Sequence, residues 1–334
     1  MVTNEEKILF ELHRSGSGVL EERFLHTHHI PQKELAKSFD DLRELGFVIE
    51  KHPQRGHRLM ESPDSLIPDD LHARLRAVHP SESFLIGNRI VVFQKTESTN
   101  DVVQKLSSQG HPEGLVVFAE SQTAGRGRHA RSWISPAGKG LWFTILLRPT
   151  LPMHSMPRVT VMTAVAVAQS LRRMTRLPLR IKWPNDILCQ GKKLAGILID
   201  LSANSGRIQS VAIGIGINVH LEENDFPVEL REVATSLKLE AGRSFHRPSL
   251  CADLLSELER WSPSVNDADF PKLLDAWSEL DETVGTQVCV HSAGKPPLRG
   301  LALSLDTDGA LLVRTDSGQI EKVIAGDVTM EKMK

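Results

Sequence analysis

The sequence predicts a multi-domain α/β protein, and three observations support that fold class. The chain has 334 residues, enough for roughly two domains of ordinary size with room for a small third one. Apolar residues make up 40% of it and charged residues 25%, which is the balance of a folded globular protein. Strand-like and helical patterns alternate through residues 83–280, whereas helical patterns come before this region and short strand-like runs after it.

Residues 1–63 are expected to form a winged helix-turn-helix. Apolar residues recur at helical spacing in residues 4–14, and again at Leu35, Phe39, Leu42 and Leu45 until Gly46 ends the pattern. Strand-like runs at residues 47–50 and 57–60 follow, joined by a basic turn at residues 51–56. This order places one helix in a DNA major groove and the hairpin on the phosphate backbone.

The DNA contacts predicted for this module are Lys33, Lys37, Arg43 and Arg55. Residues 1–62 hold nine Lys and Arg residues against eleven Asp and Glu residues, which is a poor balance for a protein that binds phosphates. A winged helix with a structural or dimer-forming role is therefore the alternative.

The remaining segments follow in order along the chain. Residues 61–82 hold three prolines and several acidic residues, so 64–82 is predicted to be a linker with a short helix around 71–78. The central domain, 83–280, has strand-like runs at 90–93, 115–119, 141–147, 194–200 and 209–213, and helical patterns at 155–173 and 248–261. Residues 281–334 carry short runs at 284–290, 298–305, 311–315 and 320–324, which predict a small β-barrel.

Composition excludes several classes of protein. The formal charge of -2 argues against unspecific binding to nucleic acid or membrane over the whole surface. Cys189, Cys251 and Cys289 are far apart in the sequence, so neither a disulfide framework nor a zinc site is indicated, and we expect a cytoplasmic protein. The most apolar helical stretch, residues 159–168, is too short to cross a bilayer, so no membrane role is expected.

The segment with the clearest chemical character is residues 125–133, Gly-Arg-Gly-Arg-His-Ala-Arg-Ser-Trp, which we call the arginine loop. Glycine lets the backbone approach a ligand, guanidinium groups bind phosphate or carboxylate, and an indole offers a flat face to a heteroaromatic ring. These are the parts of a nucleotide site. A solvated surface loop or a nucleic-acid tether is the alternative, because short Gly-Arg strings are weak motifs.

Four more polar, turned segments stand out in the central domain: residues 97–100, 182–186, 192–196 and 214–218. Ser98 or Thr99 can cap a helix that starts near Asn100. Asp186 can hold a magnesium ion or simply belong to a turn. Lys193 stands at the start of an apolar strand, where it can neutralise phosphate. Gly214 and Gly216 can mark an ordinary strand bulge.

The order and spacing of these segments around the arginine loop resemble the biotin protein ligase family, over nearly all of the chain. The resemblance implies a winged helix-turn-helix, a central mixed α/β ligase domain of the biotin/lipoate ligase type and a small Src-homology-type β-barrel, as in members that also repress the biotin operon. Pro31 and Gln32 replace the Ser-Arg pair with which the family's reading helix usually starts. Glu331 stands where bifunctional members tend to carry an arginine near the nucleotide.

The resemblance also implies which residues bind the substrates. The biotin side would be lined by Ser98, Thr99, Asn100, Gln122, Gly125, Arg126, Gly127, Arg128, Lys193 and Gly196. The ATP side would involve Arg131, Trp133, Asn185, Asp186, Gly216 and Asn218. Lys193 and Arg128 would be catalytic, and Mg²⁺ would accompany ATP, with Asp186 as its carboxylate.

The implied reaction has two steps. Biotin and ATP give biotinyl-5'-AMP and pyrophosphate, and a lysine of a biotin carboxyl carrier protein of acetyl-CoA carboxylase then displaces AMP. The further partners implied are operator DNA and a second copy of the chain, as a homodimer when ligand is bound. The alternatives are a lipoate-protein ligase, which adenylates its acid in the same way, and a biotin-sensing transcription factor without catalysis.

Overall fold

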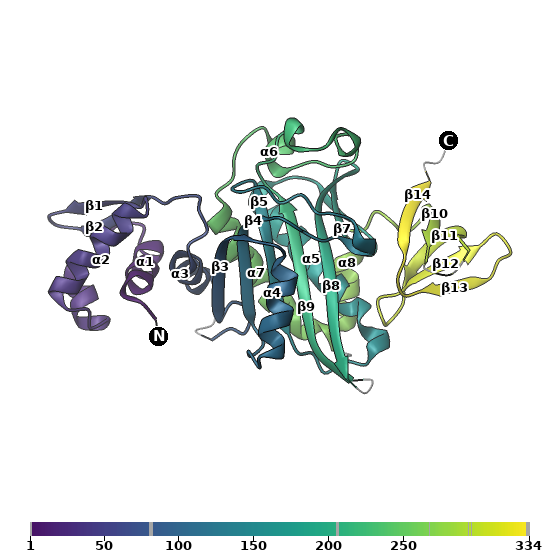
Figure 1. Cartoon of the computed structure of the whole chain (residues 1–334), viewed down its shortest axis with the longest axis horizontal. Coiled ribbons are helices and arrows are strands. Elements are labelled where there is room, and N and C mark those ends of the chain that lie inside the picture. The colour runs from purple at the N-terminus through teal and green to yellow at the C-terminus, as the bar shows by residue number, and fades with distance from the viewer. Residues whose placement is uncertain are drawn as a thin grey trace.

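The computed structural model of the chain describes residues 2–79, 83–204, 207–266, 268–292, 294 and 296–331. Figure 1 shows three groups of elements along its longest axis: helices with a hairpin, a large central sheet and a small C-terminal sheet. Within the described residues no helix is long and apolar enough to span a membrane.

The N-terminal module has the predicted order of elements. Helices α1 (Asn4–Arg14) and α2 (Gln32–Glu44) flank a π-helical turn, η1 (Arg23–Thr27), and strands β1 (Val48–His52) and β2 (Gly56–Glu61) form an antiparallel hairpin. The residue pair Val19 and His57 adds a bridge to this hairpin. Its core contains Leu35, Phe39 and Leu42, as the spacing predicts, but Leu45 is 49% exposed because it lies at the C-cap of α2.

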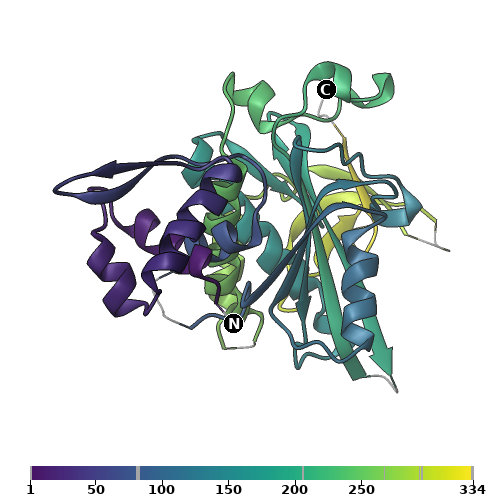
Figure 2. The ribbon, with the colours of Figure 1, turned by 60° about the vertical axis from the view of Figure 1, so that its left-hand side comes forward.

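The predicted linker contains a longer helix than expected. Helix α3 (Pro68–Val78) begins at a proline and packs against both α1 and α7 (Arg247–Trp261). Leu71 and Leu75 are fully buried, and so is Asp70, which lies 2.7 Å from both His13 Nε2 and Arg74 Nε. The segment therefore joins the N-terminal module to the central domain through a packed interface (Figure 2).

The central sheet has seven strands in the order β3-β4-β5-β9-β8-β7-β6, and only the β3–β4 pair is parallel. All five predicted runs lie in strands. The bounds are β3 (Arg89–Thr96), β4 (Leu115–Gln122), β5 (Gly140–Leu147), β6 (Leu179–Lys182), β7 (Asp186–Cys189), β8 (Lys192–Asn204) and β9 (Arg207–Asn218). The β6–β7 hairpin had not been predicted as strands, because each strand has only four residues around a turn that contains a cis proline, Pro184.

Helices cover both faces of this sheet. Alternate β4 residues face opposite sides, so Val117 packs with α4 (Thr99–Ser108) and Phe118 packs in the main core. That main core lies under α5 (Pro157–Thr175) and α7, and α8 (Phe270–Ser278) packs against α5. A short helix, α6 (Leu237–Ala241), follows β9 at the end of the sheet where the site lies (Figure 1).

The C-terminal module is a five-stranded antiparallel sheet in the order β13-β12-β11-β10-β14. Its strands are β10 (Gln287–His291), β11 (Leu298–Leu305), β12 (Leu311–Thr315), β13 (Ile320–Val323) and β14 (Asp327–Glu331). In the part of the chain that the structure describes, β13 and β14 do not pair, so hydrogen bonds do not close the predicted barrel. Trp183 anchors this module to the central domain by donating its indole N–H to Gly309 O at 3.2 Å.

Candidate active site

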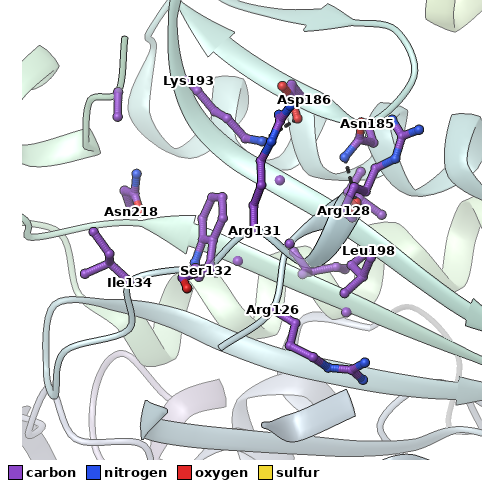
Figure 3. A pocket seen from close by; sticks show the side chains of 18 of the residues that line it. Arg126, Arg128, Arg131, Ser132, Ile134, Asn185, Asp186, Lys193, Leu198 and Asn218 are labelled. Atoms are coloured by element: carbon purple, nitrogen blue, oxygen red, sulfur yellow. Dashed lines mark hydrogen bonds and ion pairs between the residues drawn. The ribbon is translucent and has the colours of Figure 1, made fainter. Parts of the chain in front are cut away.

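A cavity of about 450 Å³ opens at one end of the central sheet, beneath the arginine loop (Figure 3). The start of α4, the end of β4, the β6–β7 turn and the facing strands β8 and β9 form its walls. Phe226, Leu230, Val233 and Ala234 close one side, and Asp327 and Met330 of β14 reach it from the C-terminal module.

One end of the cavity is a network of neutral polar groups. Thr99 donates its backbone N–H to Gln122 Oε1 at 2.8 Å, and Gln122 Nε2 donates to Ser135 Oγ at 3.0 Å. Thr144 donates to Asn100 Oδ1 at 2.6 Å from the adjacent strand. Ser98 is the N-cap residue of α4, but its hydroxyl makes no capping hydrogen bond. Helix capping therefore does not account for that hydroxyl.

A glycine makes room for this network. Asn100 lies directly against Gly214, and a Cβ at that position would collide with the Asn100 carboxamide. The strands β8 and β9 pair in regular register across Gly214, so this glycine does not mark a bulge. Glycine is required there because Asn100 occupies the space of a side chain.

The arginine loop folds back on itself like a small hairpin. Trp133 donates its backbone N–H to Gly125 O at 2.8 Å, and Gly127 donates to Arg131 O at 2.7 Å. At the tip, His129 and Ala130 adopt positive φ values of 54° and 56°, a left-handed conformation that is unusual for residues with side chains. The strain lies at the tip, whereas both loop glycines have ordinary φ values.

Each arginine of the loop faces a carboxylate. Arg126 lies 2.6 Å from Asp101 and 2.8 Å from Asp200. Arg131 donates to Asp327 at 2.6 Å.

Arg128 also donates to neutral oxygens. It reaches Asn185 Oδ1 at 2.9 Å and Gly326 O at 3.1 Å, with Asp327 3.9 Å away. Burial lowers the pKa of Arg128 from its usual value, although Asp327 and Asp186 act in the opposite direction. The loop is therefore held to α4, β8 and the C-terminal module at once.

Lys193 lies between the polar network and the nucleotide-type residues. Its Nζ is 2.6 Å from Asp186 Oδ1 and 5.4 Å from the centre of a Trp133 ring. The Trp133 indole lies directly against Gly216 and Gly196, and a Cβ on Gly216 would collide with it. The indole N–H is buried and has no acceptor among the described residues.

The family models match most of this architecture. Residues 92–218 match the biotin/lipoate A/B protein ligase family, and residues 283–330 match the biotin protein ligase C-terminal domain. The bifunctional ligase/repressor BirA of Bacillus subtilis is 34% identical over 294 residues, which is 88% of each chain. The chain belongs to the biotin protein ligase family.

Other members agree with this assignment. The biotin–[acetyl-CoA-carboxylase] ligase of Mycobacterium tuberculosis is 32% identical, over 71% of this chain and 87% of its own. The biotin protein ligase of Aquifex aeolicus, solved in complex with biotin and ATP, superimposes with a TM-score of 0.63 at 26% identity, over 74% of this chain and all of its own. The match of residues 283–330 to the biotin protein ligase C-terminal domain favours biotin over the lipoate alternative.

The structure brings the residues expected on the two substrate sides into one place. All of them line the cavity except Gly125, which lines an adjacent hollow on the other side of the loop. Gly125 still has a steric role, because a Cβ there would collide with Trp133 O.

Several lining residues had not been predicted. Lys182 lies within a segment that was singled out, yet received no role, and its ammonium makes no hydrogen bond or ion pair with the described residues. No sequence motif indicates that Asp327 or the apolar residues within 226–234 belong to the site. Long-range packing brings them to the cavity.

The predicted DNA contacts are all exposed. Lys33 and Lys37 lie on α2, and Arg55 lies in the turn of the β1–β2 hairpin. Arg43 is paired with Asp40 at 2.8 Å and packs over the Phe39 ring, so its charge is partly used within the helix.

Proposed function

We propose that this chain is an ATP-dependent biotin–protein ligase that forms biotinyl-5'-AMP and transfers biotin to a lysine of a carrier protein. The observation that carries the proposal is the position of Lys193, which lies between the neutral polar network and the Trp133 region in one cavity. Biotin has a neutral polar ring at one end and a carboxylate at the other, so it fits a site whose cation lies away from the amide and hydroxyl groups.

The biotin end of the site would use Ser98, Thr99, Asn100 and Gln122, all of which line the cavity. Buried amide and hydroxyl groups select a ligand that satisfies their hydrogen bonds and reject one that leaves them unpaired. Lipoate offers a disulfide ring with weak acceptors only, so this end of the cavity favours biotin.

In the first step a biotin carboxylate oxygen attacks the α-phosphorus of ATP, and the bond to the β-phosphate oxygen breaks to release pyrophosphate. Two anionic groups approach each other, so a fixed cation between them stabilises the transition state. Lys193 is placed for this role because Asp186 holds its ammonium at 2.6 Å. Arg128 would hold the phosphate of the mixed anhydride, and the loop would keep water from it.

The ATP side would use Trp133 and Arg131 with Asn185, Gly216 and Asn218. Asn185 and Asn218 are held by main-chain carbonyls, through Nδ2 to Ile197 O and to Thr235 O, both at 2.9 Å. Their positions are thus set before ligand binds. The Lys182 ammonium makes no hydrogen bond or ion pair with the described residues, so it would be free to bind the departing pyrophosphate.

The cavity residues fit a magnesium ion only if ATP supplies further oxygen ligands. Asp186 offers one carboxylate in the cavity, and the described residues contain no cluster of three or more His, Cys, Asp or Glu side chains that could hold a metal. Mg²⁺ usually binds through phosphates plus one or two carboxylates and neutralises phosphate charge when bound, so Asp186 is the residue that would hold it.

In the second step the carrier lysine amine attacks the acyl carbon, AMP leaves with the bonding electrons, and the amine loses a proton. The partner we infer is a biotin carboxyl carrier protein of acetyl-CoA carboxylase, since a curated relative is named for that substrate. We infer that the protein acts in the cytoplasm, where ATP, biotin and this carrier are present.

The experiment that tests this function is biotin-dependent exchange of labelled pyrophosphate into ATP. We expect exchange with wild type and with Lys192→Ala, since Lys192 points to Arg231 O outside the cavity, and loss of exchange with Lys193→Ala. Exchange with lipoate instead of biotin would reassign the substrate. Absence of exchange with either acid would contradict the enzymatic function and leave a biotin-sensing protein.

A second function, repression of biotin-synthesis genes, is favoured by the N-terminal module. Lys33 and Lys37 are exposed on α2 with no partner among the described residues, and the Bacillus relative is named as a ligase and repressor. Biotinyl-AMP would be the corepressor and a homodimer the DNA-bound form, because a palindromic operator matches a two-fold axis.

A gel shift with promoter DNA of the biotin-synthesis genes tests repression. We expect DNA binding that requires biotinyl-AMP. Lys37→Ala should weaken it and reduce the number of counterions released on binding by about one, as read from its salt dependence. The remote variant Lys272→Ala should bind DNA like wild type. Adenylate-independent or absent binding would remove this function while leaving the ligase intact.

A further inference from the structure

We propose that Asp200 is a positioning residue that fastens the arginine loop to the start of α4 and orients Asn100 at the polar end of the cavity. The proposal rests on the ligase function above. Asp200 lies in β8, outside the set of residues that line the cavity, and neither the loop nor the polar segments of the sequence point to it.

The geometry converges on a single carboxylate oxygen. Asp200 Oδ2 accepts from Arg126 Nη2 at 2.8 Å, from Asn100 Nδ2 at 3.0 Å and from Gln104 Nε2 at 3.2 Å. The first donor belongs to the arginine loop and the other two to α4. One strand residue therefore joins two segments that are separate in the sequence.

The consequence for Asn100 is a fixed amide orientation. Its Nδ2 donates to Asp200, its Oδ1 accepts from Thr144 at 2.6 Å, and its carboxamide lies directly against Gly214. Rotating the carboxamide by half a turn would place its oxygen against the Asp200 carboxylate, which can only accept hydrogen bonds. Asp200 thus fixes the orientation of the Asn100 carboxamide in the wall of the cavity.

The consequence for Arg126 is that its charge is already matched. Its guanidinium lies between Asp200 and Asp101, whose side chains are 21% and 53% exposed. The less exposed carboxylate makes the stronger pair, because solvent screens Asp101 more effectively. Arg126 therefore stabilises the position of the loop. Arg128 is the loop arginine that contacts Asn185.

Two variants separate these roles. Asp200→Asn keeps the size of the side chain but removes the charge that attracts the three donors. Asp101→Asn is the matched control, because it removes the other carboxylate near Arg126 without contacting Asn100 or Gln104. Asp200→Glu keeps the charge and serves as the conservative variant, and urea unfolding midpoints check that all three fold like wild type.

In the exchange assay we expect Asp200→Asn to raise the KM for biotin about tenfold, the scale of losing one charge-assisted hydrogen bond. The KM for ATP should stay within about twofold, because Arg128 and Arg131 remain held by Asn185 and Asp327. Asp101→Asn should stay within about twofold for both substrates, and Asp200→Glu should recover part of the loss. A purely structural role would move both KM values together, so that result would overturn the proposal.

A second readout needs no activity. Limited trypsin digestion of the unliganded protein can be followed at the three arginines of residues 125–133. We expect cleavage there to be several-fold faster in Asp200→Asn than in wild type or Asp101→Asn. Equal cleavage rates together with an unchanged KM for biotin would overturn the proposal and leave the ligase function standing. If wild type performs no exchange, the ligase function fails and the digestion still decides whether Asp200 holds the loop.

Discussion

At the scale of single residues, the site depends on the absence of side chains as much as on charged groups. Gly216 supports the Trp133 indole, and a Cβ there would overlap its five-membered ring. A residue larger than glycine must displace the indole, because the strand backbone of β9 is paired on both sides and cannot retreat.

The first prediction concerns this contact. Gly216→Ala should raise the KM for ATP at least tenfold through a displaced indole, while the KM for biotin changes by less than threefold. Steady-state exchange kinetics measure both constants. Gly16→Ala is the control, since nothing lies within 4 Å of the Cβ position of Gly16. An ATP KM equal to that of wild type would mean that Trp133 is not part of the nucleotide site.

The second prediction concerns Lys182. If it binds the phosphates that leave, Lys182→Met should raise the KM values for ATP and pyrophosphate about tenfold, because one charge contact is lost. Transfer from preformed biotinyl-AMP to the carrier should be unaffected, since no pyrophosphate takes part in it. Arg180→Met, on the same strand but outside the cavity, should behave like wild type. Slower transfer from the adenylate would place Lys182 elsewhere in the mechanism.

Many site residues could be predicted from the sequence because they lie in short polar segments next to apolar strands, as Lys193 does before β8. Asp200 and Asp327 could not. Each looks like an ordinary strand residue, and each gains its importance from an arginine that lies 74 or 196 residues away in the chain.

At the scale of elements, the packed faces of α1 and α3 contain buried carboxylates beside basic groups. Burial alone would raise the pKa of Glu6, but hydrogen bonds and charge from His72 and Arg76 lower it overall. The pKa of Asp70 is lowered in the same way by His13 and Arg74, against the effect of its burial.

The third prediction follows from the sign of these shifts. A carboxylate whose pKa is lower in the folded state stabilises the fold above its unfolded value, here 4.5 for Glu and 3.8 for Asp, and this stability disappears as the pH falls below those values. Burial lowers the pKa of His57 below 6.5, despite the opposing effect of Glu21, so His57 also begins to destabilise the folded module below that pH. Asp69 acts in the opposite direction, since burial raises its pKa.

We therefore expect the N-terminal module to unfold first between pH 5 and pH 3. All five tryptophans lie at residue 133 or later, so their fluorescence reports the rest of the chain. Circular dichroism at 222 nm should lose helical signal in this range before the tryptophan emission shifts. Simultaneous changes in both signals would contradict the prediction.

The elements themselves were partly predictable. Long amphipathic helices and apolar strands are correct to within a few residues, for example 115–119 within Leu115–Gln122. The β6–β7 hairpin was missed because its turn residues dominate the pattern, and α3 extends further than its apolar residues indicate because Pro68 can start a helix.

At the scale of the whole molecule, the central domain contacts both of the other modules, and the C-terminal module also reaches the cavity. The C-terminal module holds the arginine loop through Asp327 and Gly326, and it holds the β6–β7 turn through the Trp183 indole. At the other junction, Asp64, the first residue of the segment that follows the N-terminal module, contacts Arg247 at the start of α7 at 2.8 Å. The C-terminal module therefore contributes directly to the wall of the ligand cavity, whereas none of the described lining residues comes from the N-terminal module.

The last prediction concerns the N-terminal junction. Arg247 is 3% exposed and donates to Asp64, to Glu120 at 2.7 Å and to Gly140 O, while Glu120 also accepts the backbone N–H of Leu66 at 2.8 Å. Removing one partner leaves the other charge buried, which costs about 3–5 kcal/mol.

Glu120→Gln should accordingly lower the free energy of unfolding measured in urea by about 3 kcal/mol. The exposed pair of Lys272 and Asp269 provides the control, because Lys272→Met should change the same quantity by less than about 1 kcal/mol. Glu120 lies two residues before Gln122 in β4, so the variant should also raise the KM for biotin. A large loss of stability with an unchanged KM would mean that the junction holds the modules together without positioning the site.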